Sequence, residues 1–183
     1  MTDKKEIPET TCIVQGRLSH CHVFVAKSFE DGSAAKYRTW VLVPKEEITI
    51  GGVKMGGKKA VSKIRDAILA AKIAKWGDDT SKHPKIPQDK SLMRDGDAQI
   101  ADDEGNKSDA SWVTEETRGH YIVSVSEHQS RPDVLDRDGS TVLGESDGKI
   151  YSGAYARVII NTCLLYTSPS PRDLSTSRMP SSA

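Results

Sequence analysis

The chain has 183 residues, of which 36% are hydrophobic and 28% are charged, and its 26 Lys and Arg residues balance 26 Asp and Glu residues. This length predicts one domain with enough residues for a core, and no apolar run approaches the roughly 20 residues that a membrane helix needs. The zero net charge argues against a uniformly basic nucleic-acid binder, so any such binding depends on where the charges lie. The first residues lack the apolar centre of a secretory signal, and we expect a cytoplasmic protein.

The first third of the chain predicts three strands. Residues 10–27 form a long extended segment that Gly16 interrupts, and a glycine inside a strand often marks a bulge or a sharp bend. Residues 36–43 predict a second strand, and a short third strand follows at 47–54. A long bent first strand is what a small closed barrel needs, because that strand must take part in both of its sheets.

A single helix is predicted at residues 58–76, where apolar residues from Val61 to Ala71 recur at helical spacing and Gly77 ends the pattern. Lysines surround this apolar stripe. The next segment, 78–118, is polar, acidic and punctuated by Pro and Gly, so we expect a long loop. Loops of this length are uncommon in compact domains and often serve a function.

Residues 119–126 and 150–161 predict the last two strands, and a turn-rich link separates them. The resulting order, β-β-β-α-β-β, is that of the OB-fold, a partly open Greek-key barrel that commonly binds oligonucleotides. We therefore predict a mainly β fold with one helix (α+β), arranged as an OB-like Greek-key β-barrel. Order of elements alone does not establish function.

Both ends of the chain are expected to lie outside this domain, which spans residues 10–162. Residues 1–9 should be flexible, and residues 163–183 are rich in Ser, Pro and Thr, which predicts a disordered tail. The stretch Cys163–Asp173 resembles the translation of a transposase-based sequencing adaptor, and Thr176–Ala183 resembles its continuation. We therefore expect a foreign tail and a truncated C-terminus.

Three short motifs are compatible with catalytic or metal chemistry, but each has a simpler interpretation. The run Gly52–Lys59 departs from the phosphate-binding loop, because Lys59 stands where a hydroxyl should bind magnesium. His20–His22 contains two histidines and a cysteine that alternate between the faces of a strand, so they cannot easily meet one ion. The acidic run Asp102–Glu104 fits solvated loop charge better than a cation site. The sequence therefore predicts no metal and no cofactor.

Alternation in the last predicted strand places Tyr151, Tyr155 and Arg157 on one face and small residues on the other. Small residues can pack inward, which leaves two rings and a guanidinium pointing outward. Rings stack on bases and Arg side chains hold phosphates without reading the base sequence. For each tyrosine, a position in the core stays open as the alternative. The full set of candidate DNA-binding residues is Tyr151, Tyr155, Arg157, Tyr121, Tyr37, Arg38, Arg17 and Arg94.

Six short segments, in the right order, resemble a phage family of single-stranded-DNA-binding proteins. They are Val43–Lys45, Lys75–Gly77, Arg94–Asp97, Gly119–Tyr121, Arg131–Pro132 and Tyr151–Arg157. The resemblance covers about residues 10–162 and implies an OB-fold, sequence-independent binding of single strands and no catalytic residue. Members of this family continue through another β segment to an acidic disordered tail, and we expect both to be replaced here.

The leading hypothesis is therefore a non-enzymatic protein that coats single-stranded DNA intermediates in phage DNA replication or recombination, in the cytoplasm of the bacterial host. The expected partners are single-stranded DNA and phage replication proteins that would bind the missing C-terminal tail, and a homo-oligomer is a further expectation. Two alternatives stay open. One is a small metal-dependent nuclease built on Asp95, Asp97 and Asp102, and the other is an OB-fold protein-interaction module.

Overall fold

The computed structural model describes residues 9–28, 34–101 and 105–162, which form nine strands and one α-helix. The elements are β1 (Thr11–Lys27), β2 (Lys36–Pro44), β3 (Glu47–Ile50), β4 (Val53–Gly56), α1 (Gly57–Trp76), β5 (Met93–Asp95), β6 (Gln99–Ala101), β7 (Lys107–Asp109), β8 (His120–Glu127) and β9 (Tyr155–Asn161). The expected tail at 163–183, nearly all of the expected flexible start and the acidic run Asp102–Glu104 lie outside the described residues. Within these ranges, no helix has the length and apolar character that crossing a bilayer requires.

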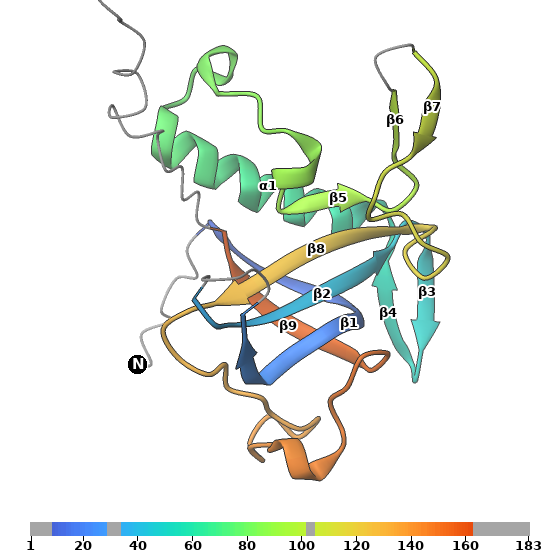
Figure 1. The fold of residues 1–183 in the computed structure, drawn as a ribbon. Helices are drawn as coiled ribbons and strands as arrows, with labels where there is room; N and C mark the ends of the chain where they lie inside the picture. Colours follow the sequence, from blue (N-terminus) through green and yellow to red (C-terminus); the bar gives the residue numbers. More distant parts are fainter. Residues whose placement is uncertain (1–8, 29–33, 102–104, 163–183) are drawn as a thin grey trace, which may run out of the picture.

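Five of the strands form one antiparallel sheet in the order β5-β8-β2-β1-β9 (Figure 1). Strand β1 connects the two halves of this sheet, because it pairs with β9 through Thr11–Arg17 and with β2 through Arg17–Lys27. Strand β2 pairs with β8 in unbroken register from Tyr37 to Pro44. Two separate hairpins, β3-β4 and β6-β7, complete the strands, and Figure 1 shows β6-β7 standing away from the sheet.

Helix α1 covers one face of the sheet with the apolar stripe that its spacing predicts. Val61 and Ile64 are 5% and 1% exposed and pack with Val14, Val41 and Val123 from the three central strands. Each such aliphatic side chain contributes about 1.5–3 kcal/mol when fully buried. The helical prediction is therefore confirmed, with a start one residue earlier than expected.

The prediction of a mainly β fold with one helix is confirmed, whereas the closed barrel is wrong for the described residues. The sheet is open, with β5 and β9 at its edges. The predicted third strand at 47–54 instead folds on itself as the β3-β4 hairpin, around Gly51 and Gly52 with φ of 56° and 77°. Glycine adopts these positive φ angles without strain. The segment thus satisfies its backbone groups internally and does not pair with either edge of the sheet.

The predicted loop at 78–118 contributes more structure than expected. It supplies β5 and the β6-β7 hairpin, and it places Trp112, which is 5% exposed, against Leu42 and Ile122. The indole Nε1 of Trp112 donates to the carbonyl oxygen of Asp95 at 2.9 Å. This segment therefore covers part of the sheet face that points away from α1.

Of the two interpretations of Gly16, a bulge or a sharp bend, the register excludes the bulge. The pairing of β1 with β9 is regular through Gly16, and the register of β1 against β2 shifts later, between Ser19 and His22. A Cβ atom at Gly16 would lie 2.2 Å from the carbonyl oxygen of Leu42. The glycine thus allows β2 to approach β1 at the point where β1 exchanges one partner strand for the other.

We predict that Gly16→Ala lowers the free energy of unfolding by about 1–3 kcal/mol, because backbone atoms must move to admit the methyl group. Chemical denaturation followed by circular dichroism measures this change. Gly144→Ala is the matched control, since a Cβ there meets nothing closer than the Ser146 hydroxyl at 3.7 Å. Equal stability of the two variants would contradict the close approach.

Candidate nucleic-acid interface

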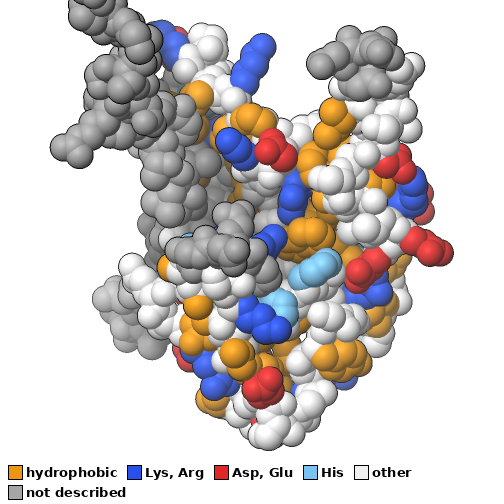
Figure 2. Space-filling view, in the orientation of Figure 1, with side chains coloured by type: hydrophobic (Ala, Val, Ile, Leu, Met, Phe, Trp, Pro, Cys, Tyr) orange, Lys and Arg blue, Asp and Glu red, His pale blue; other side chains and the backbone are white. Residues whose placement is uncertain are grey.

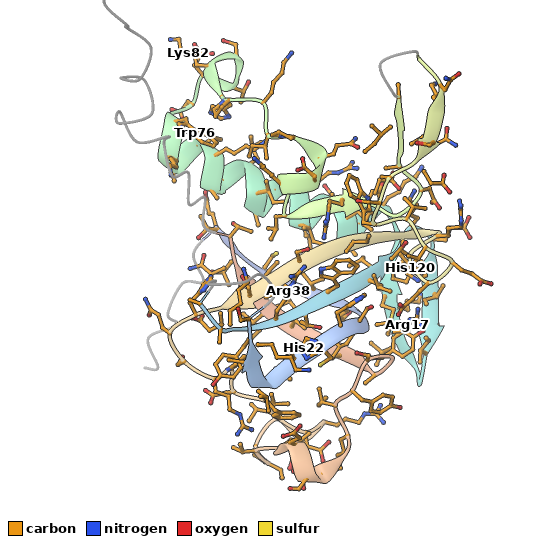
Figure 3. The ribbon with its side chains drawn as sticks, viewed as in Figure 1. Arg17, His22, Arg38, Trp76, Lys82 and His120 are labelled. Carbon is orange, nitrogen blue, oxygen red and sulfur yellow. The ribbon has the colours of Figure 1, made fainter. Side chains whose placement is uncertain are left out.

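The sheet has a second face, which α1 does not cover and which we call the open face. Residues paired directly across an antiparallel ladder share a face. The register pairs Arg17 with Leu42, Ser19 with Trp40 and His22 with Arg38, and on the far side Ser124 with Trp40 and Ile122 with both Leu42 and Arg94. Figure 3 shows Arg17, His22 and Arg38 on this side of β1 and β2. The open face therefore combines cations, imidazoles and indoles.

At the centre of the open face, three side chains surround the indole of Trp40; we call Trp40, Arg38, Arg94 and His20 the Trp40 cluster. The Arg94 guanidinium carbon lies 5.0 Å from the Trp40 ring centroid, and that of Arg38 lies 5.8 Å away. The His20 ring centroid is 4.5 Å from the Trp40 centroid. Figure 2 shows Lys, Arg and His side chains gathered around hydrophobic atoms in the middle of this face. Each cation–π contact of this kind contributes roughly 0.5–2 kcal/mol.

Arg94 is the most constrained member of the Trp40 cluster. Its guanidinium lies between two indoles, 5.0 Å from Trp40 and 5.4 Å from Trp112, and its Nη2 donates to the Ser124 hydroxyl at 2.8 Å. Burial lowers the pKa of Arg94, and the charge of Arg38 lowers it further, while Asp89 acts in the opposite direction. An arginine stays protonated despite such a shift, so the structure holds a partly desolvated positive charge here.

Two nitrogen atoms of the Trp40 cluster are buried without a hydrogen-bond partner in the described part of the chain. They are Nε1 of Trp40 and Nε of Arg94. A buried donor that lacks an acceptor costs about 1–3 kcal/mol. The Trp40 indole thus has no hydrogen bond from its Nε1, and Arg94 is held through its Nη2 bond to Ser124 and not through its Nε. Both side chains are half-buried, which leaves part of the ring and of the guanidinium open for contact.

The strand β1 brings two histidines to this face through a local irregularity. His20 has φ of 50°, in the left-handed region, and sits where the register of β1 against β2 shifts. Its Nδ1 lies 2.9 Å from the Ser19 hydroxyl. His22, opposite Arg38, has its pKa lowered by burial first, and then by the charges of Lys27, His20 and Arg38. Both histidines therefore belong to the aromatic and basic surface.

The structure brings five of the eight predicted site residues to the open face: Arg17, Arg38, Arg94, Tyr155 and Arg157. Arg17 forms an ion pair with Glu116 at 3.1 Å, so its charge is partly used within the chain. In β9, Tyr155 is 43% exposed while its alternate neighbours Ala156, Val158 and Ile160 pack toward α1. The expected division of this strand into an inward and an outward face is confirmed from Tyr155 onward.

The remaining three predicted tyrosines lie elsewhere. Tyr37 and Tyr121 share the parity of Val41 and Val123, so they point to the side of the sheet that α1 covers. The Tyr121 hydroxyl accepts from Arg65 of α1 at 3.4 Å, and Lys45 lies over its ring at 5.2 Å. Tyr151 is 59% exposed but precedes β9, in a turn that the Ala154 N–H closes by donating to the Tyr151 carbonyl at 3.0 Å. Strand alternation therefore does not apply to it.

The acidic residues of the alternative nuclease hypothesis are engaged in ion pairs. The Lys45 ammonium lies 2.5 Å from a carboxylate oxygen of Asp95 and 2.7 Å from one of Asp97. Asp97 also accepts from the backbone N–H of Gly119, and the Lys45 hydrogen bond is the main reason that the pKa of Asp97 is lowered. The third acid, Asp102, lies outside the described residues. Across the described ranges, no three His, Cys, Asp or Glu residues form a group suited to a metal ion.

Trp40 is the residue that the sequence analysis missed. A signal was present, because Arg38, Trp40 and Leu42 alternate in a predicted strand and therefore share a face. The contact between His20 and Trp40 could not be found in this way, since it depends on the irregularity in β1.

Comparisons with known proteins give one family and one fold. A family model described as the ssDNA-binding protein of Enterobacter phage Enc34 matches residues 10–172. The solved structure of the single-stranded DNA-binding protein from bacteriophage Enc34 in complex with ssDNA is 22% identical, with a TM-score of 0.57 over 82% of this chain and 72% of that chain. A C-terminal truncation of the same phage protein is 23% identical, with a TM-score of 0.58 over 84% and 74%. These identities establish a shared fold, and no curated protein sequence matches.

We predict that His22 titrates below its ordinary pKa of 6.5, because burial and neighbouring positive charges disfavour the imidazolium. An NMR titration that follows the His22 ring protons measures the midpoint. Arg38→Ala should move that midpoint upward, since it removes one of the repulsive charges. A midpoint at or above 6.5 in the unchanged protein would contradict the described environment of His22.

Proposed function

We infer the function of this chain from its family: it belongs to that of the ssDNA-binding protein of Enterobacter phage Enc34, and we propose that it binds single-stranded DNA without reading the base sequence. The observation that carries this proposal is the Trp40 cluster, in which two guanidinium groups and an imidazole surround an indole on an open sheet face. Such a surface can hold phosphates and stack bases at the same time.

The side chains of the open face can contact both the phosphates and the bases of a bound DNA strand. Guanidinium groups hold phosphate oxygens and also stack on bases through their flat surfaces. The Arg38 and Arg94 side chains provide both properties next to Trp40. None of these contacts needs a particular base, because every base has an aromatic face and every nucleotide has a phosphate. Binding that does not depend on base sequence follows.

Strand β9 extends this surface beyond the Trp40 cluster. Tyr155 pairs with Arg17 and Arg157 pairs with Gln15, so both extend the open face across β1. With the Gln15 amide turned so that both of its polar groups find partners, its oxygen accepts from the Arg157 guanidinium at 2.9 Å. We propose Tyr155 as a second stacking ring, after Trp40, and Arg157 as a further phosphate ligand beside Arg38 and Arg94.

The biological role that fits these properties is protection of single-stranded DNA intermediates. We propose that the protein coats DNA exposed during phage DNA replication or recombination, in the cytoplasm of the infected bacterium. A non-enzymatic role is consistent with Asp95 and Asp97, which are both engaged by Lys45. A fluorescence titration with poly-dT, with and without magnesium, tests the proposal: tight binding without cleavage supports it, while cleavage or no binding contradicts it.

Tyr155→Ala should weaken binding to oligo-dT by about 1–3 kcal/mol, the usual contribution of one ring stacked on a base. Tyr155→Phe is the matched control, because it keeps the ring and removes only the hydroxyl. We expect this control to bind like the unchanged protein in fluorescence anisotropy. If Tyr155→Ala folds normally and binds with unchanged affinity, Tyr155 is not in the interface.

Arg38→Ala should reduce the salt dependence of binding as well as the affinity. Each phosphate neutralised on a single DNA strand adds about −0.7 to the slope of log affinity against log salt concentration. The slope of the Arg38→Ala variant should therefore be less steep by about 0.7, whereas Arg137→Ala, in an exposed loop, should leave it unchanged. Anisotropy titrations at several salt concentrations measure both slopes, and an unchanged slope for Arg38→Ala would exclude a phosphate contact.

A further inference from the structure

A groove of about 510 Å³ adjoins the Trp40 cluster, at the place where β8 continues past β5. Strand β5 pairs with β8 only as far as Val123, and the Ser124 N–H then donates to the Leu92 carbonyl at 3.0 Å. Beyond that point the groove opens between β8 and α1. The residues that line it include Ser124 and Ser126 of β8 and Ile68 of α1.

The charge of this groove is strongly positive. Five cations line it against the single acid Asp89: Lys36, Arg38, Lys72, Lys90 and Arg94. Two of these, Arg38 and Arg94, are members of the Trp40 cluster, so the groove and the cluster share a boundary. The three lysines come from β2, α1 and the turn before β5, which are far apart in the sequence. The fold therefore brings separate positive charges to one channel.

The three groove lysines, like several other lysines of the described ranges, are not neutralised by an ion pair with a carboxylate. Lys45, Lys54, Lys82 and Lys149 each form an ion pair with a carboxylate. Within the described ranges, Lys36, Lys72 and Lys90 form no such ion pair. Like charges gathered in one groove repel each other, and a polyanion relieves that repulsion.

We infer that this groove is a second segment of the DNA path, in which the phosphates of a DNA strand leaving the Trp40 cluster meet Lys72, Lys90 and Lys36. The inference rests on the proposed function, and it adds binding residues that no sequence motif indicates. Arg38 and Arg94 stand where the two segments meet. A DNA strand that follows this path leaves the open face and passes over the edge of the sheet toward α1.

The two segments predict a dependence on DNA length. A short oligonucleotide can occupy the Trp40 cluster alone, whereas a longer one must also enter the groove. Single-stranded-DNA-binding sites of this general kind cover about 4–16 nucleotides, so a series of oligo-dT lengths across that range separates the two segments. The groove lysines should affect only the longer members of the series.

The test compares two double variants that remove the same charge. Lys72→Gln with Lys90→Gln changes the groove, and Lys58→Gln with Lys107→Gln is the matched control on exposed parts of α1 and β7. For long oligo-dT, the salt slope of the groove variant should be less steep by about 1.4, from about 0.7 for each of two phosphates. For the shortest oligo-dT that binds, both variants should match the unchanged protein.

Two results would overturn the inference. One is an equal change in both double variants, which would mean a general electrostatic field, and the other is an unchanged slope for long oligo-dT in the groove variant. Binding of the Arg38→Ala variant to the shortest oligo-dT tests the Trp40 cluster alone. The groove inference can therefore be disproved while the proposed function stands. If the unchanged protein binds no oligo-dT of any length, the proposed function and this inference fail together.

Discussion

In the described part of the chain, one α-helix covers a five-stranded sheet, and it packs on one face of that sheet. The stripe of α1 that includes Val61 and Ile64 buries the centre of one face. On the other face, within the described residues, the segment around Trp112 covers Leu42 and Ile122. Arg38, Trp40 and Arg94 on the same face are half-buried, and a sheet face that is partly open to water carries polar or charged side chains. The same requirement leaves a broad surface with Arg38, Trp40 and Arg94 on it.

The arrangement of this surface is not explained by stability alone. Arg94 holds a partly desolvated charge beside Arg38, and the two unpartnered nitrogen atoms of the Trp40 cluster are each unfavourable by about 1–3 kcal/mol. Packing of the guanidinium between two indoles offsets part of this. Natural proteins often retain such locally unfavourable groups where they bind a ligand. The open face therefore has the character of a binding surface, in agreement with the family of the chain.

Local patterns in the sequence predicted the local structure well. The spacing from Val61 to Ala71 gave the helix, and alternation from Tyr155 gave the outward Tyr155 and Arg157. One failure was local, because Gly51-Gly52 between Ile50 and Val53 is a hairpin signal that turns the predicted strand back on itself. The others depend on pairing between distant segments, since nothing local shows that Tyr151 precedes β9 or that Trp112 covers the second face. Tyr37 and Tyr121 were misplaced because their faces follow from which side α1 packs on.

The most direct test of the account is to map where single-stranded DNA touches the protein. Ultraviolet cross-linking to oligo-dT, followed by mass spectrometry of the peptides, identifies the residues in contact with DNA in the unsubstituted protein, because stacked rings react with thymine. The account predicts cross-links at Trp40 and Tyr155, with His22 nearby, all on the open face. Cross-links confined to Tyr37 and Tyr121, on the side that α1 covers, would contradict it.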